Sequence, residues 1–391
     1  MHERHVRRED VNQCVEISKQ QKISLAQALL QKGVLPQEQI DRISRGYQAA
    51  RALNIPGYEI IGLLGAGAMA MVFKARQTAL DRVVAIKILP QKLSQNAEYL
   101  RMFKTEGRAA AKLNHPNIVQ AIDVLEADGR YFFVMEYVEG HTLYDELEGG
   151  RVFKEAEALD VVLQVAEALE HAHTHGIIHR DVKPRNIMIT EEGVCKLADM
   201  GLARVTQDQT GISAEKGRSI GTPYYMSPEQ IVGGRVDYRV DIYGLGGTLY
   251  HLVTGRMPFV GKNEREIMEK HLHKPLTPPD HIRPELSNGL GEVVELMMAK
   301  VPDNRYGSVA DLLVDLRAIR RGKPPLLARE KLSQASLEQL AAAEDGPMFS
   351  EPAEQTPTTK LPHGNTIAVI LLIVLLFLSV VLNAYFIIFY V

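Results

Sequence analysis

The stretch HRDVKPRN at residues 179–186 places a carboxylate, a lysine and an amide close together in one non-helical loop. In such a loop Asp181 could accept a proton from a hydroxyl group, and Lys183 could steady a phosphoryl oxygen. Asn186 could bind a metal ion through its uncharged oxygen. A polar loop that only caps neighbouring elements would account for Asp181 or Asn186 alone, but it leaves the whole set unexplained.

A second carboxylate follows in LADMGLAR at residues 197–204. Asp199 comes after a short apolar strand expected at 194–198, so its loop can face the same site as Asp181. Carboxylate and amide oxygens are hard ligands of the kind that Mg²⁺ prefers. The pattern therefore indicates a magnesium site.

Two further features would suit a phosphate ligand. In GAGAMAMV, at residues 65–72, Gly65 and Gly67 follow a strand and let the backbone N–H groups approach a phosphate, although a plain hairpin turn fits this signal equally well. Lys87 lies in the apolar stretch VVAIKIL, where burying its charge is costly without an anionic partner. Glu106 on the following helix and ligand phosphates are the two candidate partners.

The elements that must position these residues change in type along the chain. Apolar, β-branched runs predict strands within 58–77, 82–90 and 129–140, with Gly57 and Asp81 at turns. Helical spacing covers 97–113, which His115-Pro116 ends, and then 155–176 and 241–255. A β-rich front followed by an α-rich back predicts an α+β fold with two unequal lobes and a cleft between them.

In this order the motifs resemble those of eukaryotic-type serine/threonine protein kinases of the kind that bacteria carry. The resemblance covers the glycine-rich loop, the VAIK lysine, the helix glutamate, HRDxxxxN, the Asp-x-Gly site and MSPE, which stands where the family has Ala-Pro-Glu. It implies the bilobal kinase fold over 56–321, with the N-lobe at 56–138 and the C-lobe at 139–321.

The resemblance also implies the chemical roles. Lys87 would hold the α- and β-phosphates of ATP and pair with Glu106, while Asp199 and Asn186 would hold Mg²⁺. Asp181 would be the catalytic base and orient the attacking hydroxyl. The stretch VMEYV resembles the hinge that contacts adenine through backbone groups, with Met135 as gatekeeper, whereas on its own it would also fit a plain strand end. The implied nucleotide-binding residues are Leu64, Gly65, Ala66, Gly67, Val72, Ala85, Lys87, Met135, Glu136 and Val138.

Several positions favour protein substrates with serine or threonine acceptors. Lys183 and the stretch GTPYYMSPE, which contains Thr222, resemble the serine/threonine branch of the family. Glu229 and Arg305 match the family's buried ion pair that anchors the activation segment, and Asp241 matches the helix residue that holds the catalytic loop. Small-molecule kinases of related fold generally lack that segment.

The chain departs from the family pattern at two motifs. Ala70 replaces the third glycine of the phosphate loop and Met69 replaces its tip aromatic, which predicts altered loop closure with nucleotide binding retained. Met200 stands where the family has Phe; a flexible thioether can do the same apolar packing, and the small Ala110 leaves room for it. The prediction is a catalytically competent site. The alternative is a pseudokinase, an ATP-binding scaffold that recruits partners to a membrane.

Regulation is predicted on the activation segment. By resemblance, Arg180 would pair with a phosphate there, and Ser219 is the leading acceptor, ahead of Ser213 and Thr210. Thr222 would hydrogen-bond near the base and Lys183. The competing interpretation is that these are ordinary loop hydroxyl groups.

The two ends of the chain have different character. Residues 367–391 carry no Asp, Glu, Lys or Arg, and at about 1.5 Å per residue they exceed the roughly 30 Å of a bilayer core, which predicts a transmembrane helix. Residues 322–366 predict a flexible juxtamembrane linker. Within the N-terminal module, 1–55, residues 23–44 predict two short helices, with Ser24 and Gln27 as a cap and Gly33 as a stop. This part faintly resembles helical modules of secretion and pilus ATPases.

Composition limits the partners and the location. A net charge of −3 gives no basis for nucleic-acid binding, and Cys14 and Cys195, the only cysteines, suit a reducing compartment. The charged start predicts no secretory signal. Together with the C-terminal stretch, these features predict a single-pass membrane protein with its main domain in the cytoplasm. The kinase resemblance implies that this domain uses ATP and Mg²⁺ and phosphorylates proteins, including itself. A homodimer is expected through the transmembrane helix or the N-terminal module.

Overall fold

The computed structural model describes residues 8–41, 43–44, 55–66, 71–89, 97–200 and 223–334. Several predictions lie outside these ranges: the turn of the phosphate loop with Gly67, the activation-segment hydroxyls and the membrane-spanning stretch. The side chains of Ala66 and Glu106 are also outside the description. Among the residues that are described, no helix is both long and apolar enough to cross a bilayer.

The N-terminal part contains helix α1 (Arg8–Gln21) and helix α2 (Leu25–Gln31). Ser24 caps α2 in a capping box, in which its hydroxyl accepts from the Gln27 N–H and the Gln27 side chain accepts from the Ser24 N–H. Residues 37–41 are also helical. The sequence signals indicated α2 and the 37–41 turn, whereas α1 has no cap or stop residue that singled it out.

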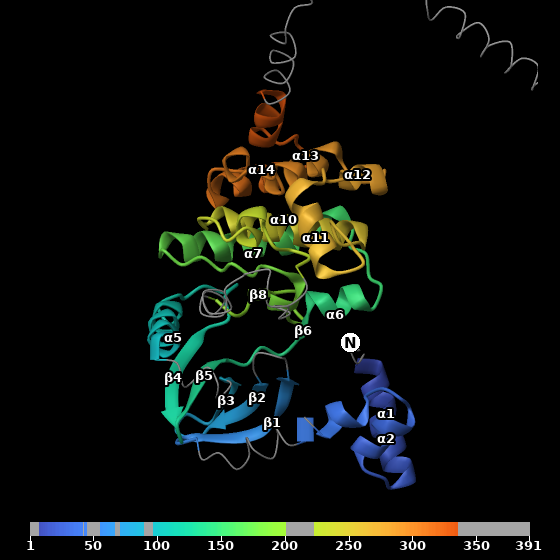
Figure 1. Ribbon diagram of the computed structural model, residues 1–391, viewed down its shortest axis with the longest axis vertical. Coiled ribbons are helices and arrows are strands. Elements are labelled where there is room, and N and C mark those ends of the chain that lie inside the picture. Colours follow the sequence, from blue (N-terminus) through green and yellow to red (C-terminus); the bar gives the residue numbers. More distant parts are fainter. Residues whose placement is uncertain are drawn as a thin grey trace, which may run out of the picture. The chain divides into compact units, whose positions relative to one another are not determined.

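The front lobe is built on an antiparallel five-stranded sheet in the order β1-β2-β3-β5-β4 (Figure 1). The strands are β1 (Tyr58–Ala66), β2 (Met71–Gln77), β3 (Arg82–Ile88), β4 (Ala121–Ala127) and β5 (Arg130–Glu136). Side chains alternate between the two faces, so Phe73, Ile86 and Phe132 enter a small buried cluster on one face. Lys87 and Phe133 occupy the opposite face.

Helix α5 (Ala97–Ala110) lies against β4 of this lobe. The ring of Phe103 meets that of Phe133 edge to face, with ring centroids 6.3 Å apart. The helix ends three residues before Leu113, the predicted last residue, because a turn already leads into the His115-Pro116 stop. The type and start of the helix were predicted correctly.

The back lobe is helical. Its helices are α6 (Leu143–Glu148), α7 (Glu155–Thr174), α9 (Pro228–Ile231), α10 (Arg239–Thr254), α11 (Glu264–His273), α12 (Pro279–Ile282), α13 (Asn288–Met297) and α14 (Val309–Arg320). Helix α10 is buried at every position after its first residue, and it contacts α7, α12 and α13. A helix that is apolar on all sides belongs in the centre of a core, and α10 forms the centre of this lobe (Figure 1).

A short sheet connects the helical lobe to the loops that carry the polar motifs. It consists of β6 (His141–Thr142), β7 (Ile187–Ile189) and β8 (Cys195–Leu197). The HRDVKPRN loop precedes β7, and Asp199 follows β8. Because β7 and β8 are adjacent antiparallel strands, the start of one lies beside the end of the other, which brings the two motifs together.

The structure differs from the prediction after α14. Residues 322–334 were expected to begin a flexible linker, yet 327–334 form a helix whose Ala328 is completely buried. The reason is a set of contacts with distant residues of the lobe, and these contacts cannot be recognised from the local composition.

Candidate active site

The sheet register brings the phosphate loop and the lysine into one row. Gly65 pairs with Val72, Val72 with Lys87, and Lys87 with Phe133. Residues directly opposite one another in paired strands share a face of the sheet. The side chains of Val72 and Lys87 therefore lie on the same face of the sheet, in the row that begins at Gly65.

Lys87 and Asp199 connect the two lobes. The Lys87 ammonium lies 2.8 Å from Oδ1 of Asp199. Burial favours the protonated carboxylic acid, but the charge and hydrogen bond of Lys87, helped by His179 and Lys183, hold the pKa of Asp199 below its usual value. A carboxylate that is ionised at neutral pH can bind a metal ion.

The catalytic-loop residues Asp181, Lys183 and Asn186 form one hydrogen-bonded cluster. The Lys183 ammonium is 2.7 Å from Oδ2 of Asp181. The Asn186 amide nitrogen donates to the backbone oxygen of Asp181 at 2.8 Å and to Oδ2 at 2.9 Å. Because the N–H groups of Asn186 face Asp181, its amide oxygen points away from that residue and can serve as a ligand.

Asp241, at the start of α10, binds the backbone of this loop. Its carboxylate is fully buried and accepts from the backbone N–H groups of His179 at 2.9 Å and Arg180 at 2.6 Å. The His173 imidazole contacts the same carboxylate at 2.8 Å. Gly244 lets α10 approach the loop, since a Cβ there would lie 2.8 Å from the Val182 oxygen.

His179 joins the loop to the segment that carries Asp199. Its Nε2 lies 2.8 Å from the Ala198 oxygen, and the Asp181 N–H donates to its Nδ1 at 3.2 Å. These two contacts fit the imidazole tautomer with hydrogen on Nε2. The residues on either side of the predicted site are thus fixed to each other through a fully buried ring.

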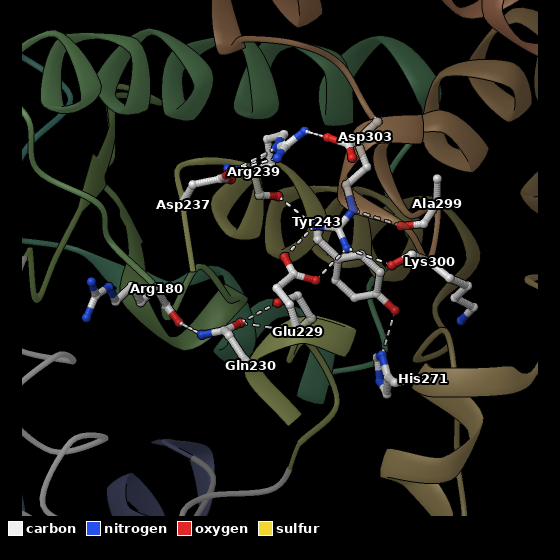
Figure 2. A network of polar contacts seen from close by, with 12 residues as sticks. Arg180, Glu229, Gln230, Asp237, Arg239, Tyr243, His271, Ala299, Lys300 and Asp303 are labelled. Carbon is white, nitrogen blue, oxygen red and sulfur yellow. Dashed lines mark hydrogen bonds and ion pairs between the residues drawn. The ribbon is translucent and has the colours of Figure 1, made fainter. Parts of the chain in front are cut away.

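Arg180 and Asp199 both adopt left-handed backbone conformations, with φ values of 67° and 62°. Such conformations cost about 1–3 kcal/mol in residues other than glycine and persist where surrounding contacts hold them. The Arg180 N–H is bound by Asp241, and its oxygen accepts from the Gln230 side chain at 2.8 Å. Figure 2 shows this contact, with the Arg180 guanidinium directed away from Gln230.

The predicted hinge, residues 134–138, begins within β5 and continues past the end of this strand at Glu136. Met135 pairs with Ala85, which places the expected gatekeeper beside the strand of Lys87. The Glu136 carboxylate lies 3.0 Å from the Lys196 ammonium and accepts from the Gln120 N–H at 3.2 Å. The Glu136 N–H is also bonded, to the Gln120 backbone oxygen at 2.9 Å, so the adenine contact of the Glu136 backbone stays a prediction.

Arg305 and Glu229 form the predicted buried ion pair. Two guanidinium nitrogens of Arg305 contact the two carboxylate oxygens of Glu229, each at 2.7 Å. The remaining N–H groups donate to the backbone oxygens of Ala299, Arg239 and Lys300 at 2.8, 3.0 and 3.2 Å. All five donors of the guanidinium are therefore satisfied in a fully buried site, part of the network in Figure 2.

Met200 is buried, as an apolar packing role requires. It is 4% exposed and belongs to the same hydrophobic cluster as Ala110 of α5. The neighbouring segment 201–222 is outside the description, so the roles of Ser219, Ser213, Thr210 and Thr222 stay predictions.

The donor set fits a magnesium ion bound together with a nucleotide. Within the described ranges, no group of three His, Cys, Asp or Glu side chains forms a closed metal cage. Magnesium does not need one, because it is usually held by one or two protein ligands together with phosphate oxygens and water. Asp199 and Asn186 supply such ligands.

The comparisons with known proteins agree with this geometry. The model of the protein kinase domain family matches residues 58–315. The chain belongs to the protein kinase family. A probable serine/threonine-protein kinase of Clostridium perfringens is 41% identical over 264 residues, which is 68% of this chain and 38% of the relative. The serine/threonine-protein kinase PknB of Mycobacterium tuberculosis is 39% identical over 272 residues, 68% of this chain and 44% of that protein.

This kinase chain thus spans less than half of the length of these curated relatives. Among solved structures, the PknI kinase domain of Mycobacterium tuberculosis has a TM-score of 0.55 at 30% identity, covering 68% of this chain and 98% of that domain. The likeness supports the bilobal fold predicted from the motifs.

Most of the predicted catalytic and metal residues meet in this kinase site, namely Lys87, Asp181, Lys183, Asn186 and Asp199. Leu64 lies on β1 and is 46% exposed, so its side chain is not enclosed here. Two residues that position the loop were missed: His173, which contacts Asp241, and Gln230, which contacts Arg180. His173 has no local motif, whereas Gln230 ends the S-x-x-Q capping box that begins at Ser227, a signal that marks the start of α9 but not the contact with Arg180.

Proposed function

We propose that this protein transfers the γ-phosphate of ATP to serine and threonine hydroxyl groups of proteins, including its own. The observation that carries the proposal is the cluster of Asp181, Lys183 and Asn186, held by the buried Asp241 and joined through His179 to the Asp199 segment. This arrangement supplies a base, a cation and metal ligands at one place, which phosphoryl transfer requires. It gives no support to the scaffold alternative, in which these groups would have no task.

Each residue then has a defined role. The two contacts that hold the Asp181 carboxylate use Oδ2, so we assign Oδ1 to the acceptor hydroxyl group. Lys183, beside that carboxylate, neutralises charge on the transferred phosphoryl group, and Lys87 binds the nucleotide phosphates. Bound Mg²⁺, held by Asp199 and Asn186, would supply charge neutralisation at the phosphates.

The adenine site is proposed at the hinge. Backbone groups of Glu136 and Val138 would contact the ring, with Met135 as gatekeeper. Leu64, Val72 and Ala85 would pack on the ring, and the turn of Gly65, Ala66 and Gly67 would cover the phosphates. Glu106 would pair with Lys87 when the nucleotide is in place. These assignments rest on the strand register and on the family resemblance.

The finer proposals concern location and partners. Residues 367–391 would anchor the chain in a membrane with the kinase domain in the cytoplasm, because ATP and reduced thiols are found there. Ser379 and Asn383 within that stretch could hydrogen-bond a second helix and so support a homodimer. The N-terminal module would bind a partner, and Arg180 would bind a phosphate on Ser219.

The test of the function uses the full chain in detergent with radiolabelled ATP, Mg²⁺ and a generic basic protein, followed by phosphoamino-acid analysis. Label should appear on serine and threonine. Asp181→Asn should keep nucleotide binding and lower transfer by at least about 10²-fold, the lower end for a positioned base. Asp128→Asn, in the exposed β4–β5 turn, is the matched control. Near-normal transfer by Asp181→Asn would refute the assignment.

A further inference from the structure

The segment after α14 is built into the kinase lobe by one buried carboxylate. Asp315, in α14, is fully buried and accepts from the N–H groups of Leu326, Leu327 and Ala328 at 2.8, 3.2 and 2.8 Å. The Tyr306 hydroxyl donates to the same carboxylate at 2.9 Å. The first N–H groups of a helix have no partner within it and carry partial positive charge, so Asp315 acts as the cap of the helix at 327–334.

Further contacts pack this helix and the residues before it against α13. Pro325 is buried against α13, where a Cβ on Gly289 would lie 2.9 Å from the proline Cδ. Arg329 forms an ion pair with Glu292 of α13 at 3.0 Å. The helix at 327–334 is therefore part of the folded lobe.

Lys331, on this helix, contacts the activation-segment anchor, which is the buried ion pair of Arg305 and Glu229. Its ammonium donates to the backbone oxygen of Arg305 at 2.5 Å and to that of Asp303 at 3.3 Å. The backbone N–H of Arg305 is already bonded to the Pro302 oxygen, and its guanidinium is saturated by Glu229 and three backbone oxygens. The Arg305 oxygen is the remaining polar group of that residue, and Lys331 binds it.

A continuous set of bonds then leads to the catalytic loop. Arg305 binds Glu229, the next residue Gln230 donates to the Arg180 oxygen, and Arg180 precedes the proposed base Asp181. Figure 2 shows the part of this path from Arg180 through Gln230 and Glu229. A buried ion pair stabilises its surroundings only when its geometry is fixed, so the 3₁₀ helix Pro302–Asn304 and the following Arg305 must be held in place.

We propose that Lys331 is a positioning residue for phosphoryl transfer, acting through Arg305 on the segment that contains Glu229. The helix at 327–334 then stabilises the activation-segment anchor, and displacing this helix makes the anchor more mobile. The proposal rests on the kinase function proposed above, and it deepens that function by placing a determinant of rate outside the residues matched by the family.

The test compares Lys331→Met and Lys331→Arg with Lys323→Met, an exposed lysine that precedes the same helix. Hydrogen exchange of the full-length proteins is followed by mass spectrometry over residues 224–232, and peptide phosphorylation kinetics are measured in parallel. Lys331→Met should exchange faster in that segment and lose about fivefold in kcat, with KM for ATP unchanged, because a charged donor is removed from the anchor. Lys331→Arg should restore both, and Lys323→Met should match the wild type.

Two results would overturn the proposal. One is a hydrogen-exchange rate over residues 224–232 in Lys331→Met that equals the rate in Lys323→Met. The other is a lowered melting temperature with kcat retained, which is the pattern of a purely structural contact. Exchange does not depend on catalysis, so a wild-type chain that transfers no phosphate would refute the function while the exchange comparison still decides the role of Lys331.

Discussion

Asp241 is the residue on which the position of the catalytic loop depends most directly. It is fully buried, and its two oxygens accept from two consecutive backbone N–H groups while also contacting His173. The left-handed conformation of Arg180 is held in part by this carboxylate.

The first prediction follows from this geometry. Asp241→Asn replaces one acceptor oxygen by an NH₂ group that faces other donors, so at least one buried N–H group loses its partner. We expect the free energy of unfolding to fall by at least about 1–3 kcal/mol and the transfer rate to fall with it. Urea unfolding and peptide phosphorylation measure the two effects. Asp123→Asn, exposed on β4, should change neither; retention of both properties by Asp241→Asn would contradict this account.

The second prediction concerns Met200. Its buried position in the cluster of Ala110 indicates apolar packing, so Met200→Phe should remain folded and active at a cost of at most about 1–3 kcal/mol from the larger ring. Thermal unfolding, ATP affinity and transfer rate are the measurements. Loss of activity with unchanged ATP affinity would show instead that Met200 and Ala110 are matched to each other.

At the residue scale, the sequence predicted what is encoded locally. Asp181, Lys183 and Asn186 share one loop, and their residue types alone indicated the chemistry. Gln230 was missed because its partner is the backbone of Arg180, fifty positions away, and His173 because it is one of several histidines near the end of α7. The capping box that contains Gln230 marks the start of α9, and it does not indicate the distant contact with Arg180.

Helices α10 and α11 each contribute a buried imidazole near the segment that follows the activation loop. His251 of α10 bonds the Tyr225 hydroxyl at 2.6 Å, and His271 of α11 bonds that of Tyr243 at 2.8 Å. Burial lowers the pKa of His251 to about 4. Burial, together with the nearby Lys300 ammonium, lowers that of His271 to about 3. Both rings are neutral when the protein is folded at neutral pH.

The third prediction is the resulting pH dependence of stability. Below pH 6.5, the ordinary value for histidine, the unfolded chain takes up protons that folded His251 and His271 do not bind. The free energy of unfolding should therefore fall as the pH is lowered from about 6.5 to about 4, by up to about 1.4 kcal/mol per pH unit for each ring. Urea unfolding at several pH values measures this slope.

Replacing both rings by glutamine should flatten the slope. The double variant His251→Gln, His271→Gln keeps hydrogen-bonding side chains but cannot take up these protons. His281→Gln, on an exposed residue of α12, is the control and should retain the steep dependence. An unchanged slope in the double variant would show that other groups govern the acid response.

At the element scale, periodicity predicted β3, β5, α5, α7 and α10, because each buries one face or all faces in a regular pattern. The helix at 327–334 was missed, since its cap is Asp315 of the preceding helix and its sequence is rich in charged residues. Capping by a residue outside the usual N-cap position cannot be identified without the tertiary contacts.

At the scale of the whole molecule, the two lobes are joined at the proposed site by the Lys87–Asp199 contact, and the catalytic domain continues to residue 334 through the Asp315 cap. The linker to the proposed membrane anchor therefore begins later than the composition suggested. Since residues up to 334 make their contacts within the lobe, removal of the anchor should leave the catalytic domain intact.

The fourth prediction tests the anchor itself. Deleting residues 367–391 removes an uncharged stretch long enough to span the roughly 30 Å of a bilayer core, so the shortened protein should move from the membrane fraction to the soluble fraction and still phosphorylate substrates. Fractionation after a high-salt wash, followed by an activity assay, measures both. Deleting 342–366, an equal length from the polar linker, is the control, and that protein should stay with the membrane. Two results would refute a membrane-spanning anchor. One is that the variant lacking 367–391 stays with the membrane in high salt. The other is that a tag after Val391 is accessible only from the cytoplasm, because a spanning helix would place that tag on the far side.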